Sequence, residues 1–172
     1  MFKIVNLSIK FFIILLLACL FFTFSTFWYF SIGLPDYKKL SNYQPPISSR
    51  VYSNDGRLIA EYALEKRLFI PFDSIPKKVI NSFLSSEDKN FFNHPGIDVK
   101  GILRAVFKNL KNISGNKRLE GASTITQQVA KNFLLTNEVS FNRKIKEAIL
   151  AFRIERAYSK ERILELYLNQ IY

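Results

Sequence analysis

The sequence has almost none of the residues that build disulfides or zinc sites, with one cysteine and one histidine among its 172 residues. The cysteine, Cys19, lies inside an apolar run, so the remainder of the chain has no disulfide framework. The histidine, His94, cannot build a zinc site alone, and we assign no metal ligands. The sequence also lacks helix-turn-helix, zinc-finger and RNP patterns, so nucleic acid is not an expected partner.

Charged residues are absent from residues 11–35. This run of roughly 25 residues would measure about 37 Å as a helix, which is enough to cross a bilayer. It is longer than the apolar core of a cleaved signal peptide, which has about 7–15 residues. The stretch ending at Cys19 loosely resembles a lipoprotein processing site, but the apolar run continues well beyond it. We therefore predict one uncleaved transmembrane signal-anchor over residues 11–34, after a short cytoplasmic head over residues 1–10.

Acidic residues are few, and the chain carries a net charge of +11. Only Lys3 and Lys10 precede the apolar run, so nearly all of this excess lies beyond it. Lysines flank the run on both sides and hardly decide its orientation, but the short head favours export of the residues that follow. A basic surface suits an anionic partner such as phospholipid head groups, pyrophosphate or nucleic acid. The alternative is a solvated basic face with no specific ligand.

The remainder of the chain divides into a linker over residues 35–49, which two adjacent prolines stiffen, and one domain over residues 50–172. A β-hairpin is predicted around a turn at residues 53–56, and a short strand at residues 67–70. The rest of the domain has helical patterning. The predicted fold class is mainly α, with a small β-hairpin near the N-terminus and one preceding transmembrane helix.

An acidic side chain stands at the end of the first predicted helix of this domain, which Ser74 can cap. Glu87 follows Phe83 by four residues and Leu84 by three, which places its carboxylate on the apolar face of the helix. A buried carboxylate is a plausible proton acceptor or donor near neutral pH. The alternative is a helix-end acid that caps the helix or pairs with Lys89.

A second informative stretch covers residues 121–132. Thr124 with Gln127 fits a capping box, so a helix is predicted to begin here. Gln128 and Lys131 continue its polar face. Free N–H groups, hydroxyls and a lysine at a helix start suit an anion, and the alternative is a solvated polar face.

Ser140 and Ser159 are expected to cap the last two helices. Arg143 and Glu147 stand four residues apart on the first of them. They form either a surface ion pair worth about 0.2–0.5 kcal/mol or an acid held beside cations in a cleft.

Four segments in this order resemble the motifs of the family-51 peptidoglycan glycosyltransferases, the polymerase domains of class A penicillin-binding proteins and of monofunctional transglycosylases. The pattern E-D-x-x-F-x-x-H-x-G is matched at residues 87–96, and G-x-S-T-I-T-Q-Q-x-x-K-N at residues 121–132. The pattern R-K-x-x-E-x-x-x-A-x-x-x-E is matched at residues 143–155, and K-x-x-I-L-E-x-Y-L-N at residues 160–169. With the hairpin region and the anchor, the resemblance covers nearly the whole chain.

The resemblance implies a lysozyme-like helical lobe with a small membrane-proximal jaw. It implies polymerisation of lipid II into glycan strands, with release of undecaprenyl pyrophosphate and inversion at the anomeric carbon. The implied location is the bacterial cytoplasmic (inner) membrane, with a single pass and the domain on the periplasmic face. Lipid II, the growing glycan, membrane lipids and other cell-wall synthesis proteins are the implied partners.

The same resemblance gives roles to particular residues. Glu87 is implied to be the catalytic base, Glu147 the second acid, and Asp88 and His94 to support Glu87 through hydrogen bonds. The implied substrate-binding residues are Ser123, Thr124, Gln128, Lys131, Asn132, Arg143 and Lys144, of which Lys131 and Arg143 would act on the leaving pyrophosphate. No cofactor is required, although the family acid at Glu147 is compatible with a divalent Mg²⁺ or Mn²⁺ at the pyrophosphate.

The resemblance also implies that a fifth motif and a penicillin-sensitive transpeptidase domain follow in a longer, bifunctional protein, so the domain is expected to be incomplete at its C-terminus. Two other functions stay open. One is a lytic enzyme on the same fold, which the basic charge and the lysine in the second motif disfavour. The other is a non-catalytic anchored module that binds anionic lipid or glycan.

Overall fold

The computed structural model describes residues 2–41, 43, 49–62, 68–113, 120–136 and 138–170. Within these ranges the chain is mostly helical with one small antiparallel sheet, which confirms the predicted fold class. The α-helices are α1 (Phe2–Ser31), α2 (Lys77–Glu87), α3 (Val99–Ile113), α4 (Ile125–Leu134), α5 (Phe141–Ala157) and α6 (Lys160–Gln170). Short 3-10 turns lie at η1 (Tyr37–Leu40), η2 (Phe72–Ser74) and η3 (Phe91–Asn93).

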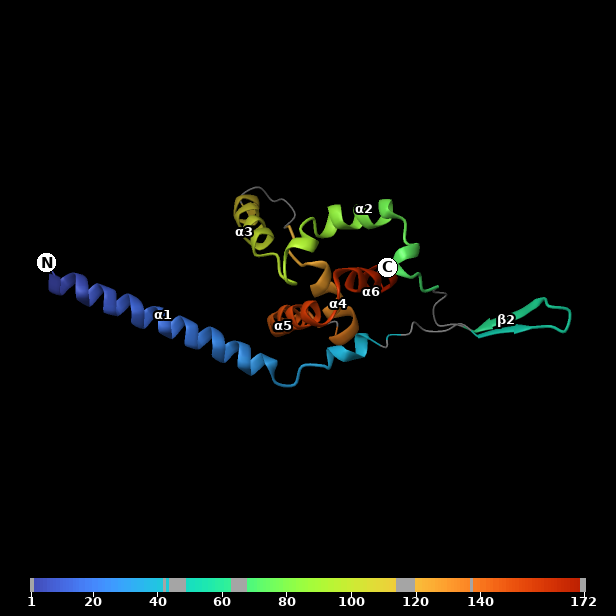
Figure 1. The fold of residues 1–172 in the computed structure, drawn as a ribbon, viewed down its shortest axis with the longest axis horizontal. Helices are drawn as coiled ribbons and strands as arrows, with labels where there is room; N and C mark the ends of the chain where they lie inside the picture. Colours follow the sequence, from blue (N-terminus) through green and yellow to red (C-terminus); the bar gives the residue numbers. More distant parts are fainter. Residues whose placement is uncertain are drawn as a thin grey trace.

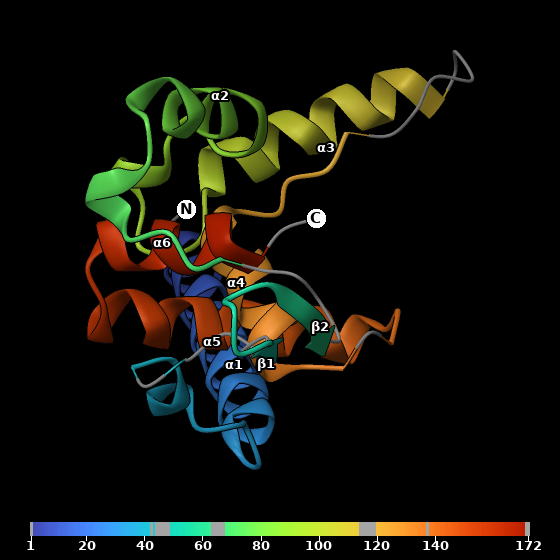
Figure 2. The same cartoon turned by 90° about the vertical axis from the view of Figure 1, so that its right-hand side faces the viewer.

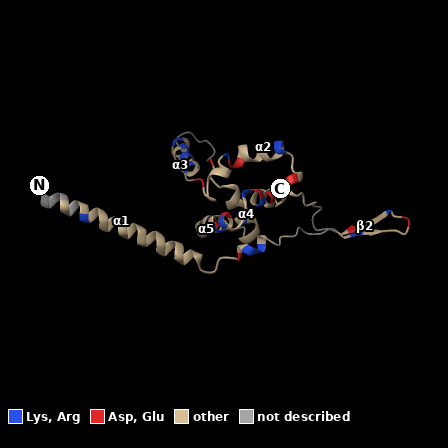
Figure 3. Ribbon diagram, viewed as in Figure 1, with Lys and Arg blue, Asp and Glu red and all other residues tan. Residues whose placement is uncertain are grey.

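Helix α1 projects from the helical body on one side (Figure 1). Its segment Ile9–Ser31 is long and apolar enough to cross a membrane, judged by length and composition. Figure 3 shows α1 almost free of charge, whereas the other helices carry basic and acidic side chains. The helix begins at Phe2, so it also includes most of the predicted cytoplasmic head.

The hairpin projects from the opposite side of the body (Figures 1 and 2). Strands β1 (Ser49–Tyr52) and β2 (Leu58–Tyr62) pair antiparallel, and Gly56 in the turn has a φ of 79°. The hairpin prediction is therefore confirmed. The predicted strand at residues 67–70 is wrong for its described part, because the Ile70 backbone bonds instead to the Asn169 side chain, at 2.8 Å through its N–H and 2.9 Å through its carbonyl.

The core lies where α4 packs against both α5 and α6. Its fully buried side chains include Ile125 and Val129 of α4, Leu150 and Ile154 of α5, and Ile163, Leu164 and Leu166 of α6. Figures 1 and 2 show α2 and α3 together on one side of this three-helix body. Because apolar burial is the main driving force for packing, this core fixes the positions of the segments between its helices.

Capping residues define four of the described helix starts, and at α3 Asp98 accepts from the N–H of the third residue at 2.9 Å. Thr124 and Gln127 form the predicted capping box of α4. Ser140 accepts from the N–H of the third residue of α5, and Ser159 does the same for α6 at 3.3 Å. The predicted Ser74 cap of α2 is wrong, since Ser74 belongs to η2 and the helix begins after Pro76 without a side-chain cap.

Candidate active site

A polar cavity of about 320 Å³ lies beside the end of α2. The end of α2, one face of α3 from Gly101 to Lys108 and the segment leading into α4 form its walls. Its lining includes the predicted site residues Glu87, Asp88, Ser123 and Thr124. The other lining residues are Ser85, Ser86, Lys89, Asn90, Asp98, Gly101, Arg104, Lys108, Glu120, Gly121 and Ala122. The cavity therefore brings the first two motifs together.

Glu87 is the last residue of α2, and its side chain is exposed. The prediction that it lies buried on the apolar face is wrong. The next residue, Asp88, leaves the helix with a φ of −155° and takes the buried position instead. Glu87 still lies on the face of α2 that carries Phe83 and Leu84, but at the last turn of the helix this face borders the polar cavity. Asp88 has left the helix, and its carboxylate turns inward.

A hydrogen bond from α4 holds the Glu87 carboxylate. The Nε2 of Gln128 donates to its Oε2 at 2.9 Å. Burial raises the pKa of the Tyr167 phenol on α6 to about 12, and the negative charge of Glu87 is the smaller cause of the same shift. Tyr167 therefore stays protonated near neutral pH. Residues of the first, second and fourth motifs meet here.

Asp88 and His94 are both buried and bond to each other. The Nε2 of His94 lies 3.0 Å from each Asp88 carboxylate oxygen, and its Nδ1 accepts from the Gly96 N–H at 3.2 Å. Because Nδ1 is an acceptor, Nε2 carries the proton and donates to Asp88. Asp88 also accepts from the Ile125 N–H at 3.1 Å, at the start of α4. Within the described chain neither side chain bonds to Glu87, so any support they give it passes through the backbone.

Other motif residues hold the segment between α2 and α3 in place. The hydroxyl of Thr124 donates to the Gly96 carbonyl at 2.6 Å. Gly96 has a φ of 94°, and a Cβ there would lie 2.8 Å from the Ala151 carbonyl oxygen of α5. The ammonium of Lys160 donates to the His94 carbonyl at 2.7 Å and to Glu155 at 2.8 Å. These contacts position the segment between α2 and α3 against α4, α5 and α6.

A second cluster lies on α5 around Glu147, whose side chain is only 2% exposed. Arg143 and Lys144 both form ion pairs with it, the latter at 2.9 Å. The ammonium of Lys144 also donates to the Ser123 hydroxyl at 2.6 Å. Ser123 in turn lines the Glu87 cavity. The predicted second acid therefore organises two cations, and one of them reaches the edge of the cavity.

Two predicted binding residues lie apart from these groups. Lys131 is half-buried and Asn132 is exposed, both on α4 beyond Gln128. Neither lines the cavity, and in the described part of the chain neither joins the ion pairs around Glu147. The roles of all the predicted site residues stay predictions.

Sequence reasoning missed three residues of α3 and its start. Arg104 and Lys108 line the cavity, and Lys108 pairs with Glu120 across it. Asp98 accepts from the Gly101 N–H at 2.9 Å, and this bond holds the pKa of Asp98 below its ordinary value. The four-residue spacing of the two cations was visible in the sequence. That they line the same cavity as Glu87 depends on how α3 packs.

Among the residues that the structure describes, no three His, Cys, Asp or Glu side chains gather in a group that could hold a metal ion. The acids nearest the cations are already paired, as Glu147 shows. The divalent metal at the pyrophosphate stays a prediction.

The comparison with protein families agrees with this geometry. The chain belongs to the transglycosylase family, whose model matches residues 55–172. It is 54% identical over 172 residues to penicillin-binding protein 1A of Rickettsia felis, and the match covers 100% of this chain and 22% of that protein. It is 51% identical over 144 residues to penicillin-binding protein 1A of Pseudomonas aeruginosa, covering 84% of this chain and 17% of that protein. With penicillin-binding protein 1A of Aquifex aeolicus it shares 49% over 140 residues, covering 81% and 19%.

These matches confirm the resemblance found in the four motifs. The chain spans about a fifth of the length of the curated relatives it matches.

Proposed function

We propose that this chain carries a peptidoglycan glycosyltransferase that polymerises lipid II into glycan strands and releases undecaprenyl pyrophosphate. The observation that carries the proposal is the placement of Glu87. Its carboxylate is exposed at a polar cavity, and the Ser123–Lys144 contact joins that cavity to the cations around Glu147. Membership of the transglycosylase family supports the same conclusion.

The chemistry follows from an exposed carboxylate near cations. Glu87 accepts the proton of the acceptor sugar's 4-hydroxyl, and that oxygen attacks the anomeric carbon of the donor. The bond from this carbon to the pyrophosphate breaks, and attack from the opposite face inverts the configuration. Gln128 keeps the Glu87 carboxylate oriented toward the cavity through its 2.9 Å hydrogen bond.

The leaving pyrophosphate gains negative charge as the bond breaks, so fixed cations near it lower the barrier. Arg143 and Lys144 are held for this task by Glu147, which is nearly inaccessible to solvent. Lys131 lies apart from both groups, one helical turn beyond Gln128 on α4, and we assign it a further charge that acts on the same pyrophosphate. A cation cluster of this kind suits a phosphate-bearing donor better than the uncharged glycosidic bond that a lytic enzyme cleaves.

Helix α1 determines where in the cell this function takes place. Its apolar segment Ile9–Ser31 crosses the bacterial inner membrane once, and the domain lies on the periplasmic face. Lipid II is anchored in the same membrane, so tethering raises the local concentration of both substrates near Glu87. Reporter fusions after Tyr43 test this topology: activity of a cytoplasmic reporter there would contradict it.

The test of the function is polymerisation of labelled lipid II by the whole protein. The wild type should form polymer, and Glu87→Gln should lower the rate by roughly 10²–10⁴-fold. Lys131→Ala and Arg143→Ala should each raise the barrier by about 2.7–4 kcal/mol, the usual effect of removing one preorganised charge contact. Shortened glycan as the product would indicate a lytic enzyme, and binding without any product would indicate a non-catalytic module.

A further inference from the structure

Helix α2 carries Glu87 at its last residue, but it packs loosely against the body of the domain. Of its eleven residues only Ile80 is buried. A cavity of about 380 Å³ lies between this helix and the end of α6, with Val79 and Phe83 on one side and Leu168 on the other. Side-chain packing along α2 therefore does little to fix its position, so the contacts at its two ends become important. The Asp88 network holds the end that carries Glu87.

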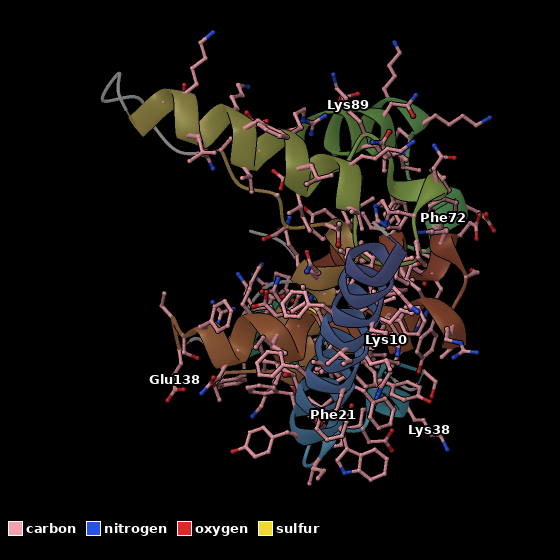
Figure 4. All side chains as sticks on the ribbon, turned by 90° about the vertical axis from the view of Figure 1, so that its left-hand side faces the viewer. Lys10, Phe21, Lys38, Phe72, Lys89 and Glu138 are labelled. Carbon is pink, nitrogen blue, oxygen red and sulfur yellow. The ribbon has the colours of Figure 1, made fainter. Side chains whose placement is uncertain are left out.

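The other end of α2 is reached through a strap, residues 70–76, which passes next to α6 (Figures 2 and 4, with Phe72 labelled in Figure 4). Asn169 of α6 accepts from the Ile70 N–H at 2.8 Å and donates to the Ile70 carbonyl at 2.9 Å. Its amide thus exchanges both bonds with one backbone residue, as a neighbouring strand would. The same NH₂ group donates to the Glu165 carbonyl at 2.8 Å, which fixes the orientation of the amide.

Glu165 lies one turn earlier on α6 and holds the next part of the strap, since it accepts from the Phe72 N–H at 2.9 Å. Glu165 and Asn169 stand four residues apart, and four residues of α-helix rise about 6 Å. Ile70 and Phe72 are separated by Pro71, whose φ of −57° and ψ of 148° are those of extended backbone. Two extended residues span about 6–7 Å, so the two spacings match and each polar side chain meets a backbone group.

We propose that Asn169 and Glu165 are positioning residues for Glu87. They hold the strap against α6, which sets the position of α2 and therefore the place of the Glu87 carboxylate at the cavity. Tyr167 of α6 supports the same arrangement, because its ring meets the Phe83 ring edge-on at 6.2 Å, one turn before Glu87. The proposal rests on the proposed function and gives the polar residues of the fourth motif a task in it.

The clamp should affect the rate of reaction more than the stability of the fold. Ile70 is exposed, so its bonds to Asn169 form in competition with water and contribute little to folding. Catalysis is more sensitive, since a displacement of about 1 Å can lower a rate by about 10²-fold. Asn169 and Glu165 lie outside the lining of the Glu87 cavity, so their loss should lower kcat and leave KM nearly unchanged.

The first test measures kcat and KM for polymerisation of labelled lipid II by the whole protein. Asn169→Leu removes both bonds to Ile70 at nearly the same size, and it should lower kcat by roughly 10–100-fold. Its KM should stay within about twofold of the wild type. Asn169→Asp keeps an acceptor for the Ile70 N–H but loses the donor to the carbonyl, so its kcat should lie between the two.

Tyr43→Phe is the matched control. It removes a hydrogen bond of 3.0 Å to Gln170, the residue next to Asn169, but keeps the ring that packs on Phe133. Tyr43 belongs to the segment before the hairpin, which does not lead into α2. The kcat of this variant should therefore stay within about twofold of the wild type.

Two substitutions of Glu165 separate the strap contact from the ion pair that this residue forms with Arg162. Glu165→Gln loses the ion pair but keeps an oxygen that can accept from the Phe72 N–H, whereas Glu165→Leu loses both. Glu165→Leu should lower kcat by about tenfold or more, and Glu165→Gln should restore most of that loss.

The second test does not depend on activity. Amide hydrogen exchange in Asn169→Leu should accelerate in the strap and in α2, over residues 70–87, and stay unchanged in the buried helix α4. General destabilisation would accelerate both regions. Tyr43→Phe should leave the exchange of α2 as it is in the wild type.

The proposal would be overturned by a wild-type kcat in Asn169→Leu, by an equal loss in Tyr43→Phe, or by equal acceleration of exchange in α2 and α4. A loss that appears only in KM would also contradict it, because it would place Asn169 in substrate binding. If Asn169→Leu does not fold, Asn169→Asp carries the same comparisons. A wild type that does not polymerise lipid II would refute the proposed function, and the exchange measurement would then decide on the clamp alone.

Discussion

Replacement of Asp88 by asparagine should destabilise the domain, although its neighbour Glu87 can be replaced almost without structural cost. The Asp88 carboxylate is buried and accepts from His94 Nε2 at 3.0 Å and from the Ile125 N–H at 3.1 Å. Asparagine keeps the shape but presents one oxygen and one NH₂ group. Since both neighbours are donors, the NH₂ group must face one of them without an acceptor.

The magnitude follows from these contacts. A hydrogen bond to a charged group contributes about 1.5–3 kcal/mol, and a buried donor left unsatisfied costs about 1–3 kcal/mol. These terms overlap, so we expect Asp88→Asn to lower the free energy of unfolding by roughly 2–4 kcal/mol. For a domain of this size that corresponds to a melting temperature lower by roughly 5–15 °C. Loss of the negative charge at the start of α4 acts in the same direction.

Glu87→Gln is the matched comparison. Glu87 is exposed, and its hydrogen-bond partner among the described residues is Gln128, so its replacement should change stability by no more than about 0.5 kcal/mol. The two variants are therefore expected to differ in how activity and melting temperature change. Asp88→Asn should lose activity in step with its melting temperature, whereas Glu87→Gln should stay folded and lose polymerisation.

The assay combines a thermal melt, a polymerisation rate and amide hydrogen exchange on each preparation. The Ile125 amide reports directly on the Asp88 contact, so its exchange should accelerate in Asp88→Asn and stay unchanged in Glu87→Gln. An Asp88→Asn protein with wild-type melting and protection at Ile125, but without activity, would refute the structural role. It would place Asp88 in the chemistry instead.

Three further predictions concern residues around the site. Gly96→Ala should lower the free energy of unfolding by more than about 1 kcal/mol, because the φ of 94° disfavours a side chain and the new Cβ would lie 2.8 Å from the Ala151 carbonyl oxygen. A thermal melt measures this, and a wild-type melting temperature would contradict it. Glu147→Gln should lower both the melting temperature and the polymerisation rate, since it leaves two cations without their partner; loss of either property alone would contradict the dual role. The bond from Gly101 lowers the pKa of Asp98 below its ordinary 3.8, so its stabilisation is present above about pH 3.8 and is lost as pH falls through the lowered value. Asp98→Asn should therefore flatten this acid dependence in unfolding measurements, and an unchanged acid limb would contradict it.

Much of the local structure could be predicted because it depends on neighbours in the chain. The capping box at Thr124 and Gln127, the Ser140 cap and the hairpin around Gly56 all rest on contacts within a few residues. The Arg143–Glu147 pair likewise follows from helical spacing. For that pair the sequence left open a surface ion pair and an acid held beside cations in a cleft, and only the packing of α5 decided that Glu147 is buried.

The misplacement of Glu87 has a physical cause. The 3.6-residue period places Glu87 on the face of Phe83 and Leu84, but it does not contain the information that at the last turn of α2 this face borders a polar cavity instead of the core. Asp88 is buried because a tertiary contact with α4 draws it inward, and no local pattern contains that information. Arg104 and Lys108 were missed for the same reason, since their direction toward the cavity depends on how α3 packs.

The polar residues of the four motifs fall into two groups. In one group the hydrogen-bonding atoms are already bonded to other protein atoms, and in the other they remain accessible to a substrate. The carboxylate of Asp88 and the ring of His94 have buried partners inside the protein, so they have little capacity left for a substrate. Among the described residues Glu87 has one hydrogen-bond partner, and its carboxylate stays open to the cavity, which Lys144 reaches through Ser123. The buried hydrogen bonds of Asp88 and His94 fix the backbone at Asp88. Because Glu87 is the adjacent residue, its backbone is also held in place while its side chain stays accessible to solvent. The rigidity that a catalytic base needs therefore comes from the acid beside it in the sequence.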